Sequence, residues 1–126
     1  MEYWVYFGMC QKKEKISKSE SFCIATILLY FGIEEDMEIA AKYVDIGLKS
    51  FPDSVPLNRF KGSILMFEAE QKGYGHLGDD ALPVFKDLTL VTEAVNYFQK
   101  ALSLMETGNW PEFMVNTVKK LFNITF

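Results

Sequence analysis

Residues 92–104 read Thr-Glu-Ala-Val-Asn-Tyr-Phe-Gln-Lys-Ala-Leu-Ser-Leu and place small Ala94 and Ala101 on either side of the large Phe98. Spacings of four and three residues put all three side chains on one face of an α-helix. Small residues let a neighbouring helix approach to about 8–10 Å, and a large residue fills the space between them. The stretch therefore predicts a helix that crosses a neighbour at close range.

A second stretch repeats this arrangement. Residues 40–52 read Ala-Ala-Lys-Tyr-Val-Asp-Ile-Gly-Leu-Lys-Ser-Phe-Pro, with Ala40, Val44 and Gly47 at the same spacings and Pro52 after them. Because proline cannot continue a helix, the second copy also predicts where its helix ends. Two copies of one packing arrangement indicate a protein built from related helix pairs.

Helical periodicity covers most of the chain, whereas period-two alternation and Asn-Gly hairpin turns are missing. The fold class is therefore predicted to be all-α, with antiparallel helices joined by short turns. The predicted helix over residues 20–32 is apolar almost all round, which is typical of a central helix covered on several sides. The predicted helices cover residues 2–14, 20–32, 37–51, 55–67, 91–105 and 110–122.

Residues 71–90 interrupt this pattern with three glycines and one proline. Twenty residues is long for a connection between helices, which usually takes about two to eight. We expect a structured loop that packs back on the domain through apolar residues, with at most a short helical turn. The apolar residues expected to make these contacts lie in its tail, residues 81–90, and are Leu82, Val84, Phe85, Leu88 and Leu90.

Composition narrows the classes of function. The 126 residues are 49% hydrophobic and 15% aromatic, which predicts a single globular domain over residues 1–126. A net charge of −4 disfavours a nucleic-acid partner. The longest apolar run, Phe22–Ile33, is shorter than the roughly 20 residues that span a bilayer.

Cys10 and Cys23 lie in apolar stretches and are interpreted as buried thiols, which favours a reducing, cytoplasmic location.

Few residues point to chemistry. His76 is the only histidine and lies in the insertion, so the sequence predicts no metal site, and we expect no enzyme and no cofactor. Gly73, Gly75 and Gly78 spell a dinucleotide-binding motif, but they follow a predicted helix instead of a strand, which argues against that reading.

The pattern of small and large residues resembles the tetratricopeptide repeat (TPR) family, whose helix pair spans 34 residues. Ala40, Val44, Gly47 and Pro52 match the second helix of that repeat, and the stretch at Ala94 matches it again. The copies start 54 residues apart, so subtracting one 34-residue period leaves 20, the length of the insertion at residues 71–90. The resemblance implies TPR-like stacking of about six helices, with the insertion between the two helices of one repeat.

The resemblance also implies a function. TPR domains commonly bind a partner's peptide or helix on the face formed by first helices, so we expect a non-catalytic adaptor or scaffold with a protein partner. The alternative is a structural subunit that self-associates into a homo-oligomer or a larger helical assembly. Loops on rigid scaffolds often carry specificity, so the insertion is included in the predicted binding surface. The predicted partner-binding residues are Arg59, Ser63, Met66, Phe67, Tyr74 and His76.

Overall fold

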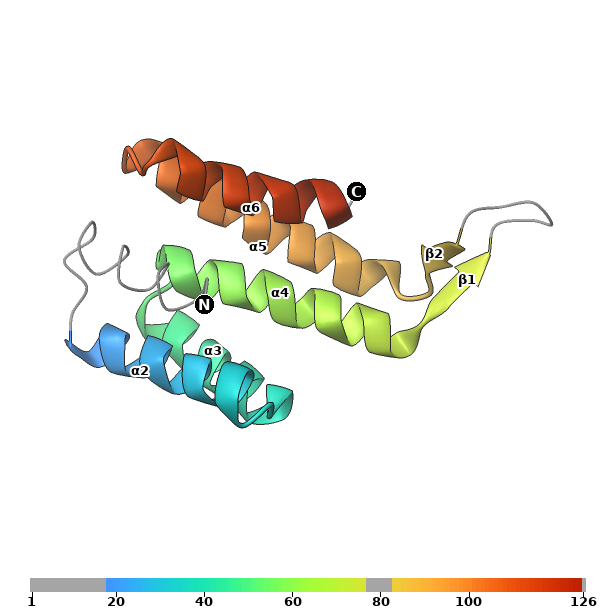
Figure 1. Ribbon diagram of the computed structural model, residues 1–126, viewed down its shortest axis with the longest axis horizontal. Helices are drawn as coiled ribbons and strands as arrows, with labels where there is room; N and C mark the ends of the chain where they lie inside the picture. The colour runs from blue at the N-terminus through green and yellow to red at the C-terminus, as the bar shows by residue number, and fades with distance from the viewer. Residues whose placement is uncertain (1–17, 77–82, 126) are drawn as a thin grey trace.

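The computed structural model describes residues 18–76 and 83–125, so the predicted helix over 2–14 and Cys10 lie outside the described residues (Figure 1). Five α-helices and one short β-hairpin make up the described part. Helix α2 continues directly into a π-helical turn, η1. The elements are α2 (Lys18–Leu28), η1 (Leu29–Ile33), α3 (Met37–Ser50), α4 (Val55–Lys72), β1 (Tyr74–His76), β2 (Pro83–Phe85), α5 (Leu88–Thr107) and α6 (Glu112–Thr125).

The predicted helical class is confirmed for the described residues, apart from the hairpin. Three of the helices begin where a polar side chain accepts a hydrogen bond from a backbone N–H in the first turn. Asp36 caps α3, Ser54 caps α4 and Asp87 caps α5, with nitrogen–oxygen distances of 3.1, 3.4 and 3.2 Å. These caps explain why each helix starts one residue after its Asp or Ser.

Each helix packs mainly against its neighbour in sequence, and α4 and α5 share the most extensive contact. Helices α2 and α3 lie on one side of α4, with α5 and α6 on the other (Figure 1). The expectation that the helix of residues 20–32 is central was wrong, because Phe22 on α2 is 74% exposed. Helix α4 takes the central place, since it contacts both α3 and α5.

Three hydrophobic clusters hold this stack together. The first joins α2, α3 and α4, the second joins the middle of α4 to α5, and the third joins the start of α4 to α5 and α6. The first contains Ile24, Ile27, Leu28, Val44, Leu57, Phe60 and Ile64; the second Leu65, Ala94 and Phe98; and the third Val55, Met105, Trp110, Met114 and Val118.

The small and large residues of the 92–104 stretch lie at the contact of α4 and α5. Ala94 and Ala101 are fully buried, and Phe98 is 1% exposed. The Phe98 ring packs over Gly62, where an added Cβ atom would come within 2.6 Å of Phe98 Cε1. Gly62 thus provides the space in α4 that the ring from α5 fills.

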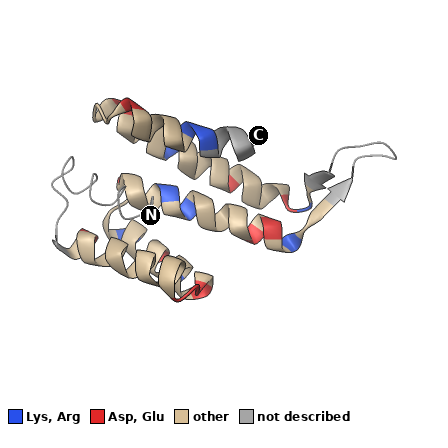
Figure 2. Ribbon diagram, in the orientation of Figure 1, with Lys and Arg blue, Asp and Glu red and all other residues tan. Residues whose placement is uncertain are grey.

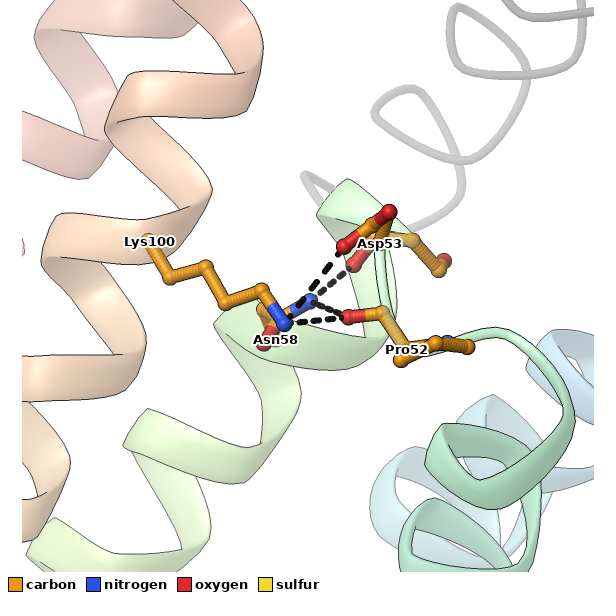
Figure 3. Close-up of polar contacts among 5 residues, drawn as sticks. Pro52, Asp53, Asn58 and Lys100 are labelled. Atoms are coloured by element: carbon orange, nitrogen blue, oxygen red, sulfur yellow. Dashed lines mark hydrogen bonds and ion pairs between the residues drawn. The ribbon is translucent and has the colours of Figure 1, made fainter.

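A polar junction ties the α3–α4 turn to α5 (Figure 3). The Pro52 carbonyl accepts hydrogen bonds from Asn58 Nδ2 at 3.0 Å and from Lys100 Nζ at 2.8 Å. Asn58, which is fully buried, also donates from Nδ2 to the Ser54 carbonyl at 2.7 Å. Lys100 Nζ lies 3.6 Å from Asp53 Oδ1. One carbonyl in a turn therefore connects the start of α4 with the middle of α5.

The insertion differs from its prediction in two ways. Its ends belong to helices, since α4 runs through Lys72 and α5 begins at Leu88. The described residues between them contain an antiparallel hairpin, in which Tyr74 pairs with Phe85 and His76 with Pro83, and no helical turn. Strands of three residues are too short to show alternation in the sequence, which explains why the hairpin was not predicted.

Candidate protein-binding surface

The predicted binding residues on α4 lie in different environments along the helix. Arg59, in the second turn, is only 6% exposed, and Ser63 is half-buried. Met66 packs against the cluster of Leu65, Ala94 and Phe98. Phe67 is 38% exposed. The exposed apolar part of the predicted α4 face therefore lies toward the end of α4 that leads into the hairpin.

The hairpin extends α4 and α5 beyond the helical stack (Figure 1). Gly73 makes the exit from α4 possible, because its φ of +86° falls in the region that favours glycine. The Gly73 carbonyl then accepts a hydrogen bond from the Lys86 N–H at 3.1 Å, which closes the base of the hairpin. An isolated two-stranded hairpin is at best marginally stable, so the Gly73–Lys86 hydrogen bond helps to hold this hairpin in place.

Aromatic packing joins the two strands. The rings of Tyr74 and Phe85 lie 4.8 Å apart between centroids, at an interplanar angle of 35°. Tyr74 remains 49% exposed, so its ring is held by Phe85 and still presents a face to solvent. The side chain of His76 lies outside the described part of the structure, although its backbone belongs to β1.

An ion pair fixes the two helices at the hairpin base. Lys72 Nζ, in the last turn of α4, lies 2.8 Å from Asp87 Oδ2, just before α5. The hydrogen bond from Lys72, together with the one from the Leu90 N–H, holds the pKa of Asp87 below its usual value. The same contact with Asp87 raises the pKa of Lys72. Asp87 therefore serves both as the cap of α5 and as the partner of α4.

Sequence reasoning missed Leu88 as a surface residue. Leu88 was expected to pack back on the domain, but it is 62% exposed in the first turn of α5. Leu90 does pack against the second cluster, as expected. Leu82 and the side chain of Val84 lie outside the described residues. The Asp87 cap indicates that α5 begins at Leu88, but it does not indicate which way the Leu88 side chain faces.

We use the name hairpin-end surface for Phe67, Tyr74 and Leu88. These three residues belong to the end of α4, to β1 and to the start of α5, which the Gly73–Lys86 and Lys72–Asp87 contacts hold together. Each is at least 38% exposed. Large exposed apolar side chains on neighbouring elements are candidates for interaction sites.

A recess of about 240 Å³ lies elsewhere, beside the α3–α4 turn and Glu20. Its volume is below the roughly 300–1,000 Å³ of typical small-molecule sites. The polar groups of its rim make internal bonds: the Pro52 carbonyl accepts from Asn58 and Lys100, and the Ser54 hydroxyl caps α4. The recess therefore offers few converging polar groups to a ligand.

Over residues 18–76 and 83–125, no group of three or more His, Cys, Asp or Glu side chains is arranged to hold a metal ion. Within the same ranges, none of the helices has the length and apolar character needed to cross a membrane. The chain matches no protein-family model, no curated protein and no solved structure.

Proposed function

We propose that this chain is a non-catalytic protein-interaction module, an adaptor or scaffold that binds a peptide or amphipathic helix of a partner protein. The observation that carries the proposal is the hairpin-end surface. Exposed aromatic and aliphatic side chains on ordered elements can act as anchors, because their burial by a partner removes apolar area from water at little cost in conformational freedom.

TPR-like stacking is part of the same proposal. It is supported by the neighbour-to-neighbour packing of the helices and by the burial of Ala40, Gly47, Ala94 and Ala101. In this arrangement α4 is a first helix and the hairpin is an insertion before its second helix, α5. Within the described residues Cys23 is a free thiol, which supports a reducing compartment such as the cytoplasm.

The proposed mode of binding uses Phe67, Tyr74 and Leu88 as apolar contacts. Tyr74 would also offer its hydroxyl to a polar group at the rim, as tyrosines at interfaces commonly do. The Lys72–Asp87 pair does not bind the partner in this scheme. It keeps the helix ends in register, so that the three anchors are presented together.

Quantitative affinity capture tests the proposal. The full chain, a Tyr74→Ser/Leu88→Ser variant and an Ile46→Ser control would be compared as baits in one lysate. Ile46 is a suitable control because it is 50% exposed on α3, away from the hairpin. We expect one or more proteins to be retained by the wild type and the control and lost with the double variant.

The identified partner would then be titrated as a purified segment by calorimetry. A loss of affinity of at least about tenfold in the double variant, with an unchanged circular dichroism melt, would support the surface. Equal binding by all three proteins would contradict it.

A further inference from the structure

Helix α2 carries an apolar stripe on the face turned away from the core. Ile24, Ile27 and Leu28 are buried in the first cluster. On the opposite side, Phe22, Leu29 and Ile33 are 74%, 40% and 62% exposed. These three are seven and four residues apart, so they follow one face of α2 and of the turn η1 that continues it. We call them the α2 stripe.

The π-helical turn η1 shapes the end of this stripe. The Glu34 N–H donates to the Leu29 carbonyl at 3.0 Å, a bond across five residues instead of the usual four. Exposed Glu34 and Glu35 follow Ile33 directly, and Glu38 is exposed in the first turn of α3. Acidic residues gather at this end of α2 and the start of α3 (Figure 2). The stripe is thus apolar along its length and acidic beyond its C-terminal end.

Helix α6 presents a face with one exposed aromatic side chain and two lysines. Phe113 is 56% exposed and lines a shallow surface recess with Asn116, Thr117, Lys119 and Lys120. Both lysines are exposed, and neither belongs to an ion pair within the described part of the chain. They form a basic region on α6 in a chain of net charge −4 (Figure 2). We call this set the α6 face.

The two faces share a local feature. Thr26 Oγ1 donates to the Phe22 carbonyl at 2.8 Å, and Thr117 Oγ1 donates to the Phe113 carbonyl at 2.9 Å. In both helices an exposed Phe is therefore followed, four residues later, by a threonine whose hydroxyl is bonded within its own helix. A hydroxyl that already has a hydrogen bond within its own helix loses less hydrogen-bonding free energy when a partner excludes water. Covering each face therefore costs less free energy.

We infer that the α2 stripe of one copy of this chain packs against the α6 face of a second copy. Helices α2 and α6 lie on opposite sides of α4, so one copy can use both faces at once (Figure 1). The contact joins two different surfaces and is therefore heterologous, which produces a closed ring or an extended row of copies. The occupant is a second copy because the acidic and basic ends are complementary.

The spacing along the helices agrees with this pairing. Glu34 and Glu35 follow Leu29 by five and six residues. Lys119 and Lys120 follow Phe113 by six and seven residues. On α6 the two lysines lie about 9–10.5 Å along the helix from Phe113, at about 1.5 Å per residue, whereas Glu34 and Glu35 directly follow the π-helical turn η1. In a parallel alignment of α2 and α6, Phe113 would lie near Leu29, with Lys119 and Lys120 on the side of Glu34 and Glu35. An antiparallel alignment would place the lysines near Phe22 instead.

Analytical ultracentrifugation of the full chain, from about 1 to 500 μM, tests the inference. We expect the average mass to rise above that of the monomer with concentration and to fall as salt is raised, since screening weakens exposed ion pairs. Lys119→Glu/Lys120→Glu and, separately, Glu34→Lys/Glu35→Lys should each weaken association at least tenfold. An equimolar mixture of the two variants should restore it, because each then meets an oppositely charged partner face.

The matched control is Lys42→Glu/Lys49→Glu on α3, which makes the same change in net charge at two exposed lysines. It should associate as the wild type does. A wild type that stays monomeric at 500 μM would overturn the inference, as would an equal loss in the control or a mixture that does not reassociate. Association that survives both charge reversals but is lost with Phe22→Ser would also overturn it, because it would indicate pairing of α2 with α2.

This test is independent of the proposed function, since it involves neither the hairpin-end surface nor any other protein. A monomeric chain could still bind a partner through Phe67, Tyr74 and Leu88.

Discussion

Gly62 shows how one missing side chain decides the contact of two helices. An added Cβ atom there would lie 2.6 Å from Phe98 Cε1 and 2.7 Å from Cδ1. Real Cβ atoms do not approach a ring so closely, and Phe98 is fixed among Leu65 and Ala94. Packed interiors tolerate such intrusions poorly, so the glycine is required by the approach of α4 to α5.

Gly62→Ala should therefore lower the free energy of unfolding by about 1–3 kcal/mol, through overpacking against Phe98. Urea denaturation monitored by circular dichroism would measure this change in the free energy of unfolding. Gly32→Ala is the matched control, because nothing lies within 4 Å of its added Cβ atom. If Gly62→Ala were as stable as Gly32→Ala, the close-approach argument would be wrong.

Asn58 is the second residue with a decisive local role. Its Nδ2 donates two hydrogen bonds in the turn before α4, whereas its buried Oδ1 has no hydrogen-bond partner within the described residues. Asn58→Ala should destabilise the fold by about 1–3 kcal/mol, because it leaves the Ser54 carbonyl buried without that donor. Asn96→Ala, at an exposed position on α5, should change stability by less than about 0.5 kcal/mol. Equal melting temperatures for the two variants would contradict this prediction.

Asp87 links two elements by one carboxylate, which makes the start of α5 sensitive to acid. The pKa of Asp87 is lowered by Lys72 and by the Leu90 N–H. The stability that the Asp87 carboxylate adds to the folded protein is therefore fully present above its unfolded pKa of about 3.9. The contribution is lost as the pH falls through the lowered folded pKa. The pKa of Lys72 is raised, so the stability that its charge adds to the folded protein is lost only at high pH, as the pH rises through that raised value.

We predict that amide protection in the first turn of α5 falls in acid, below about pH 4, before the rest of the helix loses protection. Asp87→Asn should remove this pH dependence, because asparagine can cap a helix but does not titrate. Hydrogen exchange by NMR at several pH values measures both. If amide protection in the first turn of α5 fell with pH in the same way in the wild type and in the variant, another titrating group would be responsible.

The helices themselves were largely predictable from sequence, because periodicity, caps and the small–large spacing all report local structure. Met37 was placed at the first residue of its helix, and Pro52 correctly marked a helix end. The hairpin was not predictable, since its stability comes from the Tyr74–Phe85 contact across the insertion. The exposed outer face of α2 was also missed, because periodicity cannot say how many sides of an apolar helix are covered.

Of the candidate surface, Phe67 and Tyr74 were identified from sequence, and Leu88 was not. Arg59 was placed on the binding face because its spacing fits a first helix, but α4 is so central that the residue is 6% exposed. Exposure depends on contacts with helices distant in sequence, which a single sequence without aligned relatives does not reveal.

The whole molecule divides into a helical stack and a projecting hairpin that makes few contacts with it (Figure 1). Replacing residues 74–85 with a short Gly-rich linker should therefore change the free energy of unfolding by less than about 1 kcal/mol, since loop closure depends weakly on length. The same variant should lose the binding assigned to the hairpin-end surface. A large drop in the thermal midpoint would show instead that the hairpin is part of the core.

The bond from Lys100 to the Pro52 carbonyl spans 48 residues and has a consequence for folding during synthesis. Chains fold from the N-terminus as they emerge, at about 5–20 residues per second. The first cluster needs nothing beyond Ile64, so α2, α3 and the start of α4 can pack while α5 is still being translated. The Pro52 carbonyl must wait several seconds for Lys100. Until then Asn58 is the side chain that holds the Pro52 carbonyl, and the turn gains its tie to α5 only after Lys100 has been synthesised.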